Sequence, residues 1–501
     1  MQIELGFNAG NGFRNQPVVW DSGRLVNPHI CIIGMTGAGK SYNLKRFVES
    51  LAATSGSHSY TAHVFDVHGD LQFDNASEVL FSEQTHYGLN PLEISPDPHF
   101  GGVRKRTRTF LNVIGKVSRV LGEKQQSVLR NLIYDTYENF GFHMDDPASW
   151  VIEQGSTVLP SKERFYIDVP YEDKSDASAL GARWDPDARC WWCHFDDYRD
   201  GLTRWPPKHF TRTNPTLEDV LRYAKHINRC TFLGANSEAC TKLEIVHKKA
   251  NSFVRKRLKS LATQSGYTAD KEAEELERAK QRAIESYTEY VNSVVSGKEV
   301  DQLLKYDSSD VLASVVDRLE NLNAVGIFKA ETPPFDTTKP IWRYNIRALG
   351  IEERSMFILF KCQALFEKAL ELGETDRIRE TIVIDEAHVV MDDDPDNIIN
   401  KIGLEGRKFG LQLLLVSQSP EHYPKDIMTA MGTKVVLGID ELLWKPAVGK
   451  MNIPLDALKW IILRKRFLCQ MKWVGQAQSA WTYTYFRPIN DTNKTQTGAR
   501  S

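Results

Sequence analysis

The feature that most constrains this chain is a glycine-rich segment at residues 34–41, which reads Gly-Met-Thr-Gly-Ala-Gly-Lys-Ser. It fits the G-x-x-x-x-G-K-[ST] pattern of a Walker A loop. Residues 29–33 before it are apolar and largely β-branched, as a buried strand requires, and residues 41–48 after it have helical spacing. A strand, a glycine loop and a helix start together form an anion site, because backbone N–H groups and the helix N-terminus can both face phosphate oxygens.

This loop predicts a site for ATP and Mg²⁺. Lys40 would reach the β- and γ-phosphates, and the Ser41 hydroxyl would hold Mg²⁺. The alternative, a glycine-rich turn that arose by chance, is disfavoured because the strand and the helix are both in place. The residues expected to bind ATP are Gly34, Met35, Thr36, Gly37, Ala38, Gly39, Lys40, Ser41 and Tyr42.

A second motif far along the chain resembles a Walker B strand. Four β-favouring residues at 381–384 are followed by Asp385 and Glu386. Asp385 would hold Mg²⁺ through water, and Glu386 would polarise the attacking water. A paired Asp-Glu is weak evidence alone, so the prediction depends on the preceding strand and on the Walker A loop.

Three further side chains are candidates for the same site. Asp66 ends an expected strand at residues 60–66, and its alternative role is that of a cap or turn residue. Gln418 follows an expected strand at residues 411–417 and could sense the γ-phosphate. Arg407 lies in a glycine-bounded turn and could act as an arginine finger; the alternative is an ordinary surface arginine.

The spacing of the two motifs predicts a divided core. Lys40 and Asp385 are 345 residues apart (385 − 40), whereas a compact domain of this kind takes about 100–200 residues. We therefore expect an α/β fold with a mainly parallel sheet, interrupted by a small α+β insert and a helical insert. The expected segments are a first core segment at 1–150, the small module at 160–210, the helical insertion at 211–330, the second core segment at 331–490 and a disordered tail at 491–501.

The inserts leave several interpretations open. We expect Trp184, Trp191 and Trp192 to form the small core of the first insert. Cys190 and Cys193 have zinc-ligand spacing, but no second Cys-x-x-Cys follows, so zinc is disfavoured. The basic run at 104–108 is either a solvated surface or a contact to a phosphate backbone. The long helices within 215–325 are either a solvated hairpin or an arm that docks a partner.

Composition indicates a soluble protein. The chain has 501 residues, 41% of them hydrophobic and 26% charged, with a net charge of −2. No apolar run is long enough to cross a bilayer, no signal-peptide pattern opens the chain, and the seven cysteines lack the spacing of a disulfide framework. These features predict a cytoplasmic protein that does not associate with membranes.

Taken in order, these motifs resemble the HerA/FtsK superfamily of P-loop ATPases, with HerA the nearest in pattern. The resemblance is carried by residues 34–41, 66–70, 90–92, 384–388, 406–410 and 416–420. It implies a RecA-like fold, a hexameric ring, movement of double-stranded DNA through the pore, and an Arg407 or Lys408 that reaches a neighbour's nucleotide. HerA proteins carry a β-barrel before the Walker A strand, whereas only residues 1–28 precede that strand here. The pattern at 166–205 is similar to a small domain of unknown function found on plasmid- and DNA-processing proteins.

The resemblance and the motifs together predict an ATP-hydrolysing ring motor that translocates or remodels double-stranded DNA. A nuclease or other effector is an expected partner, in antiphage defence, DNA-end processing or plasmid transfer. One alternative is a nucleotide-switched ATPase that gates a partner without moving along DNA. Another is a structural ring that binds ATP without turnover; the presence of Lys40, Glu386 and Gln418 counts against it.

Overall fold

A computed structural model describes residues 1–10, 12–55, 60–117, 121–152, 164–186, 189–208, 213–233, 237–263, 270–293, 305–306 and 308–487. The chain forms two compact units. Unit 1 contains Met1–Leu89 and Glu331–Ser501, and unit 2 contains Asn90–Ala330. The tail expected at 491–501 lies outside the described residues.

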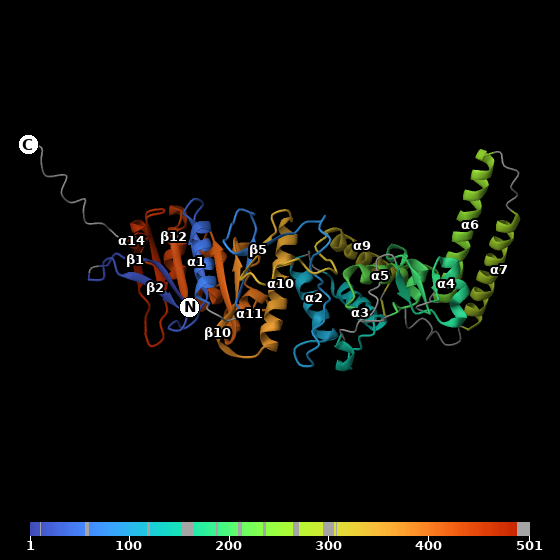
Figure 1. Cartoon of the computed structure of the whole chain (residues 1–501), viewed down its shortest axis with the longest axis horizontal. Helices are drawn as coiled ribbons and strands as arrows, with labels where there is room; N and C mark the ends of the chain where they lie inside the picture. The colour runs from blue at the N-terminus through green and yellow to red at the C-terminus, as the bar shows by residue number, and fades with distance from the viewer. Residues whose placement is uncertain are drawn as a thin grey trace, which may run out of the picture. The chain divides into compact units, whose positions relative to one another are not determined.

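Unit 1 is built on an 11-stranded sheet with the order β2-β1-β14-β13-β12-β3-β11-β10-β4-β9-β5 (Figure 1). The strands from β12 to β5 are parallel, and the four pairs from β12 to β2 are antiparallel. The expected α/β fold with a mainly parallel sheet is therefore confirmed. The bounds are β1 (Gln2–Asn8), β2 (Pro17–Asp21), β3 (Ile30–Gly34), β4 (Thr61–Asp66), β5 (Ala76–Leu80), β9 (Ile341–Asn345), β10 (Thr375–Ile384), β11 (Phe409–Ser417), β12 (Thr433–Gly438), β13 (Arg466–Met471) and β14 (Trp481–Tyr485).

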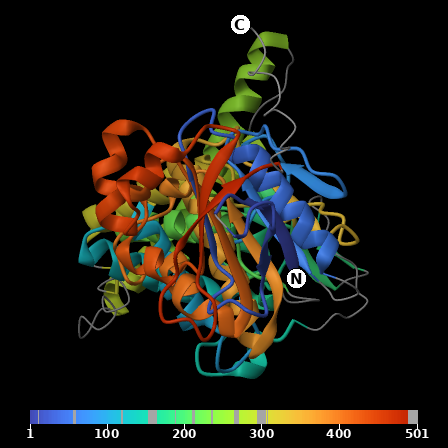
Figure 2. The ribbon, with the colours of Figure 1, turned by 90° about the vertical axis from the view of Figure 1, so that its left-hand side faces the viewer.

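Helices cover both faces of this sheet. Figure 2 shows the first helix on one face and the helices of the C-terminal segment on the other. The first helix buries Leu44, Phe47, Val48 and Leu51, whose spacing places them along one stripe that packs on the sheet. The helices of unit 1 are α1 (Lys40–Thr54), α10 (Ile351–Glu371), α11 (Ile398–Glu405), α12 (Lys425–Ala430), α13 (Trp444–Met451) and α14 (Leu455–Trp460).

Unit 2 is mostly helical. Residues 90–150 belong to it, although the sequence placed them in the first core segment. The reason is packing within unit 2: α3 lies against α2, α5 and α9, and the Tyr137 hydroxyl donates to the Leu92 carbonyl. The helices are α2 (Val103–Val117), α3 (Glu123–Asn139), α4 (Lys174–Leu180), α5 (Leu217–Leu233), α6 (Ser237–Thr263), α7 (Asp270–Ser293) and α9 (Ser309–Ala324).

The small insert holds a three-stranded antiparallel sheet with the order β6-β8-β7. Its strands are β6 (Phe165–Ile167), β7 (Arg183–Asp185) and β8 (Cys190–Cys193). The expectation that all three tryptophans form its core is wrong for Trp184, whose side chain is 51% exposed. The core instead joins α4 to aliphatic and aromatic residues that follow the sheet, among them Leu202 and Trp205.

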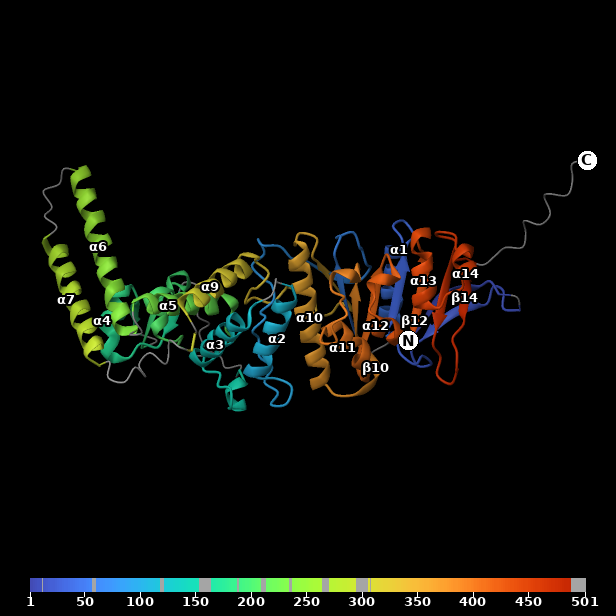
Figure 3. The same cartoon turned by 180° about the vertical axis from the view of Figure 1, so that it is seen from behind.

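Helices α6 and α7 lie side by side as a pair (Figure 3). Ion pairs link them: Lys249 to Glu275 at 2.8 Å and Lys256 to Glu272 at 2.6 Å. Both expected roles of this hairpin, solvated surface or docking arm, stay predictions. Within the described parts of the chain, no helix has the length and apolar character needed to span a membrane.

Candidate functional site

The predicted site residues of the core, apart from Arg407 and Lys408, gather at one edge of the sheet. Strands β3, β11, β10 and β4 are neighbours and run parallel, so their carboxyl ends meet at that edge. The Walker A loop follows β3, Gln418 follows β11, Asp385 and Glu386 follow β10, and Asp66 ends β4. Ligand sites in open α/β sheets form at such strand ends.

The Walker A loop has the backbone of an anion cradle. Gly37 and Gly39 have φ values of 80° and 93°, which side chains rarely tolerate. Gly39 precedes α1, and no side chain caps that helix end; the Asn43 amide donates to the Gly39 carbonyl at 2.8 Å instead. The first N–H groups of α1 therefore remain available to phosphate oxygens, with Lys40 and Ser41 in the first turn.

A residue that sequence reasoning missed holds this loop. The Arg464 guanidinium donates through Nε to the Gly37 carbonyl at 3.0 Å. Arg464 lies 427 positions from Gly37 and has a left-handed backbone with φ of 61°. No local sequence signal marks a contact of this kind, because it depends on the turn before β13.

The buried carboxylate Asp385 fits the role of a magnesium ligand. Its side chain is 3% exposed, and burial, together with the charges of Glu386 and Asp66, raises its pKa to about 7. Asp66, Asp70 and Asp385 each offer an oxygen, and these oxygens lie within 4.8 Å of one another. A divalent cation beside them would offset the clustered negative charge, and Mg²⁺ prefers such oxygen ligands. Asp70, which was not among the predicted ligands, could have been found from its place in residues 66–70.

The Glu386 carboxylate lies at the centre of a polar cluster. The Gln418 amide donates to its Oε1 at 3.2 Å. The Nε2 of His68 lies 3.6 Å from Oε1, and the Nδ1 of His388 lies 3.1 Å from Oε2. Glu386 is nearly buried and has a φ of 69°, an uncommon conformation for a residue with a side chain. This arrangement can hold a carboxylate in one orientation toward a water molecule.

Asp66 has a structural environment that matches its alternative prediction as a turn residue. Its carboxylate accepts the Gly69 and Leu71 N–H groups at 2.6 and 3.0 Å. Arg343, on β9, forms an ion pair with it at 2.7 Å. Asp66 is fully buried and Arg343 almost so, so the pair secures the turn that follows β4. Arg343 is 277 residues away in sequence, and no sequence pattern revealed this partner.

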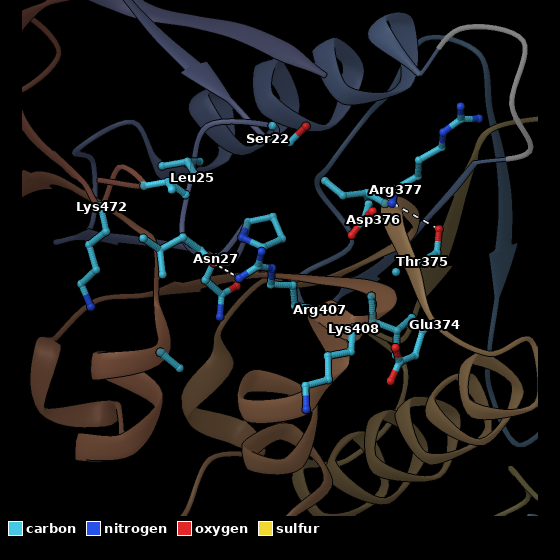
Figure 4. A pocket seen from close by; sticks show the side chains of 18 of the residues that line it. Ser22, Leu25, Asn27, Glu374, Thr375, Asp376, Arg377, Arg407, Lys408 and Lys472 are labelled. Carbon is cyan, nitrogen blue, oxygen red and sulfur yellow. Dashed lines mark hydrogen bonds between the residues drawn. The ribbon is translucent and has the colours of Figure 1, made fainter. Parts of the chain in front are cut away.

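Arg407 and Lys408 lie away from the other candidates. They belong to a short 3₁₀ helix at Gly406–Lys408 that precedes β11, whereas Gln418 follows that strand. The nine residues of β11 span roughly 30 Å. The Arg407 guanidinium donates to the Val26 carbonyl. Both side chains line a pocket of about 890 Å³, shared with Lys472 (Figure 4). Within one chain, Arg407 is thus remote from the Walker A loop.

Comparison with known proteins gives matches in two separate parts of the chain, one of which begins in unit 1 and extends into unit 2. The profile described as the central domain of helicase HerA matches residues 3–138, and the HerA-like C-terminal profile matches residues 353–440. The chain belongs to the HerA/FtsK-type P-loop ATPases. A solved structure of VirB4 from Thermoanaerobacter pseudethanolicus aligns over 97% of this chain and 96% of its own, with a TM-score of 0.52 and 11% identity. The fold is the RecA-like P-loop NTPase fold.

Relatives within the HerA group match over a short segment. The DNA double-strand break repair helicase HerA of Sulfolobus acidocaldarius is 40% identical over 63 residues, 12% of this chain and 13% of the relative. The protein of the same name from Pyrococcus furiosus is 39% identical over 62 residues, 12% of this chain and 11% of the relative. The match therefore spans about an eighth of the length of these relatives. Residues 164–207 match a domain of unknown function, DUF5710.

Proposed function

We propose that this HerA/FtsK-type chain hydrolyses ATP with Mg²⁺ and uses the energy to translocate or remodel double-stranded DNA. The observation that carries the proposal is the meeting of the Walker A loop, Asp385, Glu386 and Gln418 at the carboxyl ends of adjacent parallel strands. The relatives named as repair helicases support DNA as the substrate.

In this proposal each residue has a distinct task. The glycine backbone, Lys40 and the first turn of α1 bind the phosphates, while Ser41 and Asp385 hold Mg²⁺, which supplies charge neutralisation when bound. Glu386 accepts a proton from the attacking water, and the Gln418 amide keeps its carboxylate in place. Tyr42, exposed at the start of α1, lies where the rest of the nucleotide would extend.

We further propose that neighbouring subunits complete the site in a hexameric ring. Arg407 is too far from its own Walker A loop to stabilise the transferred phosphoryl group, so it would act on the nucleotide of a neighbour, with Lys408 beside it. A head-to-tail contact of this kind closes into a ring. In the same proposal, a nuclease or other effector protein would use the motion of the ring.

The test is ATP hydrolysis by the purified chain with and without double-stranded DNA. We expect DNA to stimulate turnover, and added salt to weaken the stimulation because cations that contact phosphates are screened. Glu386→Gln should keep nucleotide binding and lose turnover by at least about 10²-fold. Glu352→Gln removes the same charge from an exposed site on α10 and should leave turnover unchanged.

Two results would count against the proposal. If Glu386→Gln hydrolysed ATP near the unmutated rate, the assignment of Glu386 as the general base would be wrong. Turnover that is insensitive to DNA at low salt would remove the motor function and leave an ATPase that acts on another partner.

A further inference from the structure

The small module at residues 164–207 contains a pocket that the ATPase site does not use. Its volume is about 310 Å³, at the lower end of the range for small-molecule sites. Three aromatic rings and three cationic side chains line it, together with one carboxylate. These residues are Tyr171, Trp184, Trp191, Lys174, Arg189 and Lys208, with Asp168.

The rings of this pocket are presented on one face of the small sheet. Trp184 on β7 and Trp191 on β8 are register partners, with ring centroids 5.7 Å apart. Trp184 is 51% exposed and Tyr171, in the turn before α4, is 80% exposed. Large aromatic side chains that remain exposed together are typical of binding surfaces.

The opposite face of the same strands provides a contrast. Side chains alternate along a strand, so Trp192 lies on the other face, where Arg164 and Arg183 lie over its ring at 5.2 and 5.6 Å. That ring is covered by side chains of the module itself. The ring of Trp184 has no such cover among the described residues.

Positive charge surrounds the exposed rings. The Lys174 ammonium lies 3.7 Å from the centre of the Tyr171 ring, and Lys208 pairs with Asp168 at 2.8 Å. Arg189 has a left-handed backbone with φ of 51°. The three cations face one carboxylate, so the lining of the pocket carries an excess of positive charge.

This combination matches one class of ligand. An aromatic face stacks on a nucleobase whatever its sequence, and cations beside it attract the phosphate. We propose that the pocket binds a single unpaired nucleobase, stacked on Trp184, with its phosphate at Lys174 and Arg189. Single-stranded nucleic acid is the source that we favour, because the bases of a duplex are stacked inside it and cannot enter. Asp168 and Lys208 provide an acceptor and a donor for the edge of the base.

The inference goes beyond the proposed motor function and does not depend on it. None of the pocket residues belongs to the Walker motifs or to unit 1. Variants in the pocket should therefore hydrolyse ATP at the unmutated basal rate. Glu386→Gln should lose basal hydrolysis and still bind the oligonucleotide in the pocket. The two proposals can therefore fail separately.

The experiment uses the full chain and a short oligothymidylate that carries one 5-iodouracil. Ultraviolet cross-linking followed by peptide mapping should locate the label at Trp184 or Tyr171. Fluorescence anisotropy should show Trp184→Ala binding the oligonucleotide about 5- to 150-fold more weakly, with Trp184→Phe recovering most of the affinity. Arg183→Ala is the matched control, because it removes a charge from the same strand on the opposite face.

Each outcome of these experiments either supports or contradicts binding of a nucleobase in the pocket. If thymidine monophosphate displaces the oligonucleotide at concentrations similar to those at which the oligonucleotide binds, the pocket is supported and its ligand is a free nucleotide. If the monophosphate does not compete, the ligand is a single strand. If Trp184→Ala does not fold, the double variant Lys174→Ala, Arg189→Ala provides the same test. Unchanged affinity in both variants, or cross-links that lie only outside the module, would overturn the inference. So would duplex binding that Trp184→Ala weakens as much as it weakens binding of the single strand, because paired bases cannot enter the pocket.

Discussion

Acid should loosen the strand that carries the Walker A loop, because a buried neutral histidine joins it to its neighbour. His29 directly precedes β3 and is fully buried. Its Nδ1 accepts the Leu413 N–H of β11 at 3.0 Å. Burial, with a smaller effect of the nearby Arg407, lowers the pKa of His29 from 6.5 to about 4. Protonation would remove the acceptor and leave a charge in the core.

The size of the effect follows from linkage. The unfolded chain binds a proton at His29 below pH 6.5, whereas the folded chain does so only near pH 4. The stabilisation is therefore complete above pH 6.5 and is lost as the pH falls toward 4. At 1.36 kcal/mol per pKa unit, the total is about 3 kcal/mol, of which about 2 kcal/mol is lost between pH 8 and pH 5.

The assay is hydrogen exchange of peptides that cover β3 and β11, at pH 8 and pH 5, corrected for intrinsic exchange rates. The variant His29→Asn retains an acceptor for the Leu413 N–H and does not titrate. The variant should be less protected than the unmutated chain at both pH values, because the ring is missing. Between pH 8 and pH 5, the protection factor of the unmutated chain should fall about 30-fold more than that of the variant. His86→Asn, at an exposed histidine of unit 1, is the control. An equal acid loss in His29→Asn and the unmutated chain would refute the reasoning.

Three other predictions follow from the site and the module. Arg343→Leu leaves the Asp66 carboxylate buried without its cation, so thermal unfolding should show unit 1 destabilised by roughly 3–5 kcal/mol; an unchanged melting temperature would contradict the pairing. Metal analysis should find no zinc above background, since neither Cys190 nor Cys193 belongs to a cluster of three or more possible metal ligands among the described residues; stoichiometric zinc that Cys193→Ser removes would overturn this. Gln418→Ala should bind ATP normally and hydrolyse it on the order of 10- to 100-fold more slowly, and full activity would show that the contact with Glu386 is dispensable.

Local patterns were sufficient for much of unit 1. The strand before the Walker A loop and the run before Asp385 are short and apolar, as parallel strands covered on both faces must be. Their order along the chain then predicted a parallel sheet with a divided core, which the structure confirms.

What the sequence did not reveal depends on contacts between distant segments. Arg343 reaches Asp66, and Arg464 reaches Gly37, only after the sheet has formed. The packing of residues 90–150 within unit 2 also depends on distant contacts, because amphipathic helices do not specify which surface they cover. Trp184 was misplaced because the pattern does not show that β7 lies at the edge of the three-stranded sheet. Its ring stays half exposed there, although its register partner Trp191 packs against the core of the module.

The central claim is that one subunit's Walker site is completed by Arg407 of its neighbour, and a mixing experiment tests it most directly. Lys40→Ala subunits cannot bind the phosphates but retain Arg407. Arg407→Ala subunits should bind ATP and assemble, yet lose turnover by a factor on the order of 10³. Neither variant alone should hydrolyse ATP appreciably, whereas mixed rings contain interfaces with both groups intact, so activity should partly return. Mixtures that stay inactive, or normal turnover by Arg407→Ala alone, would contradict the account.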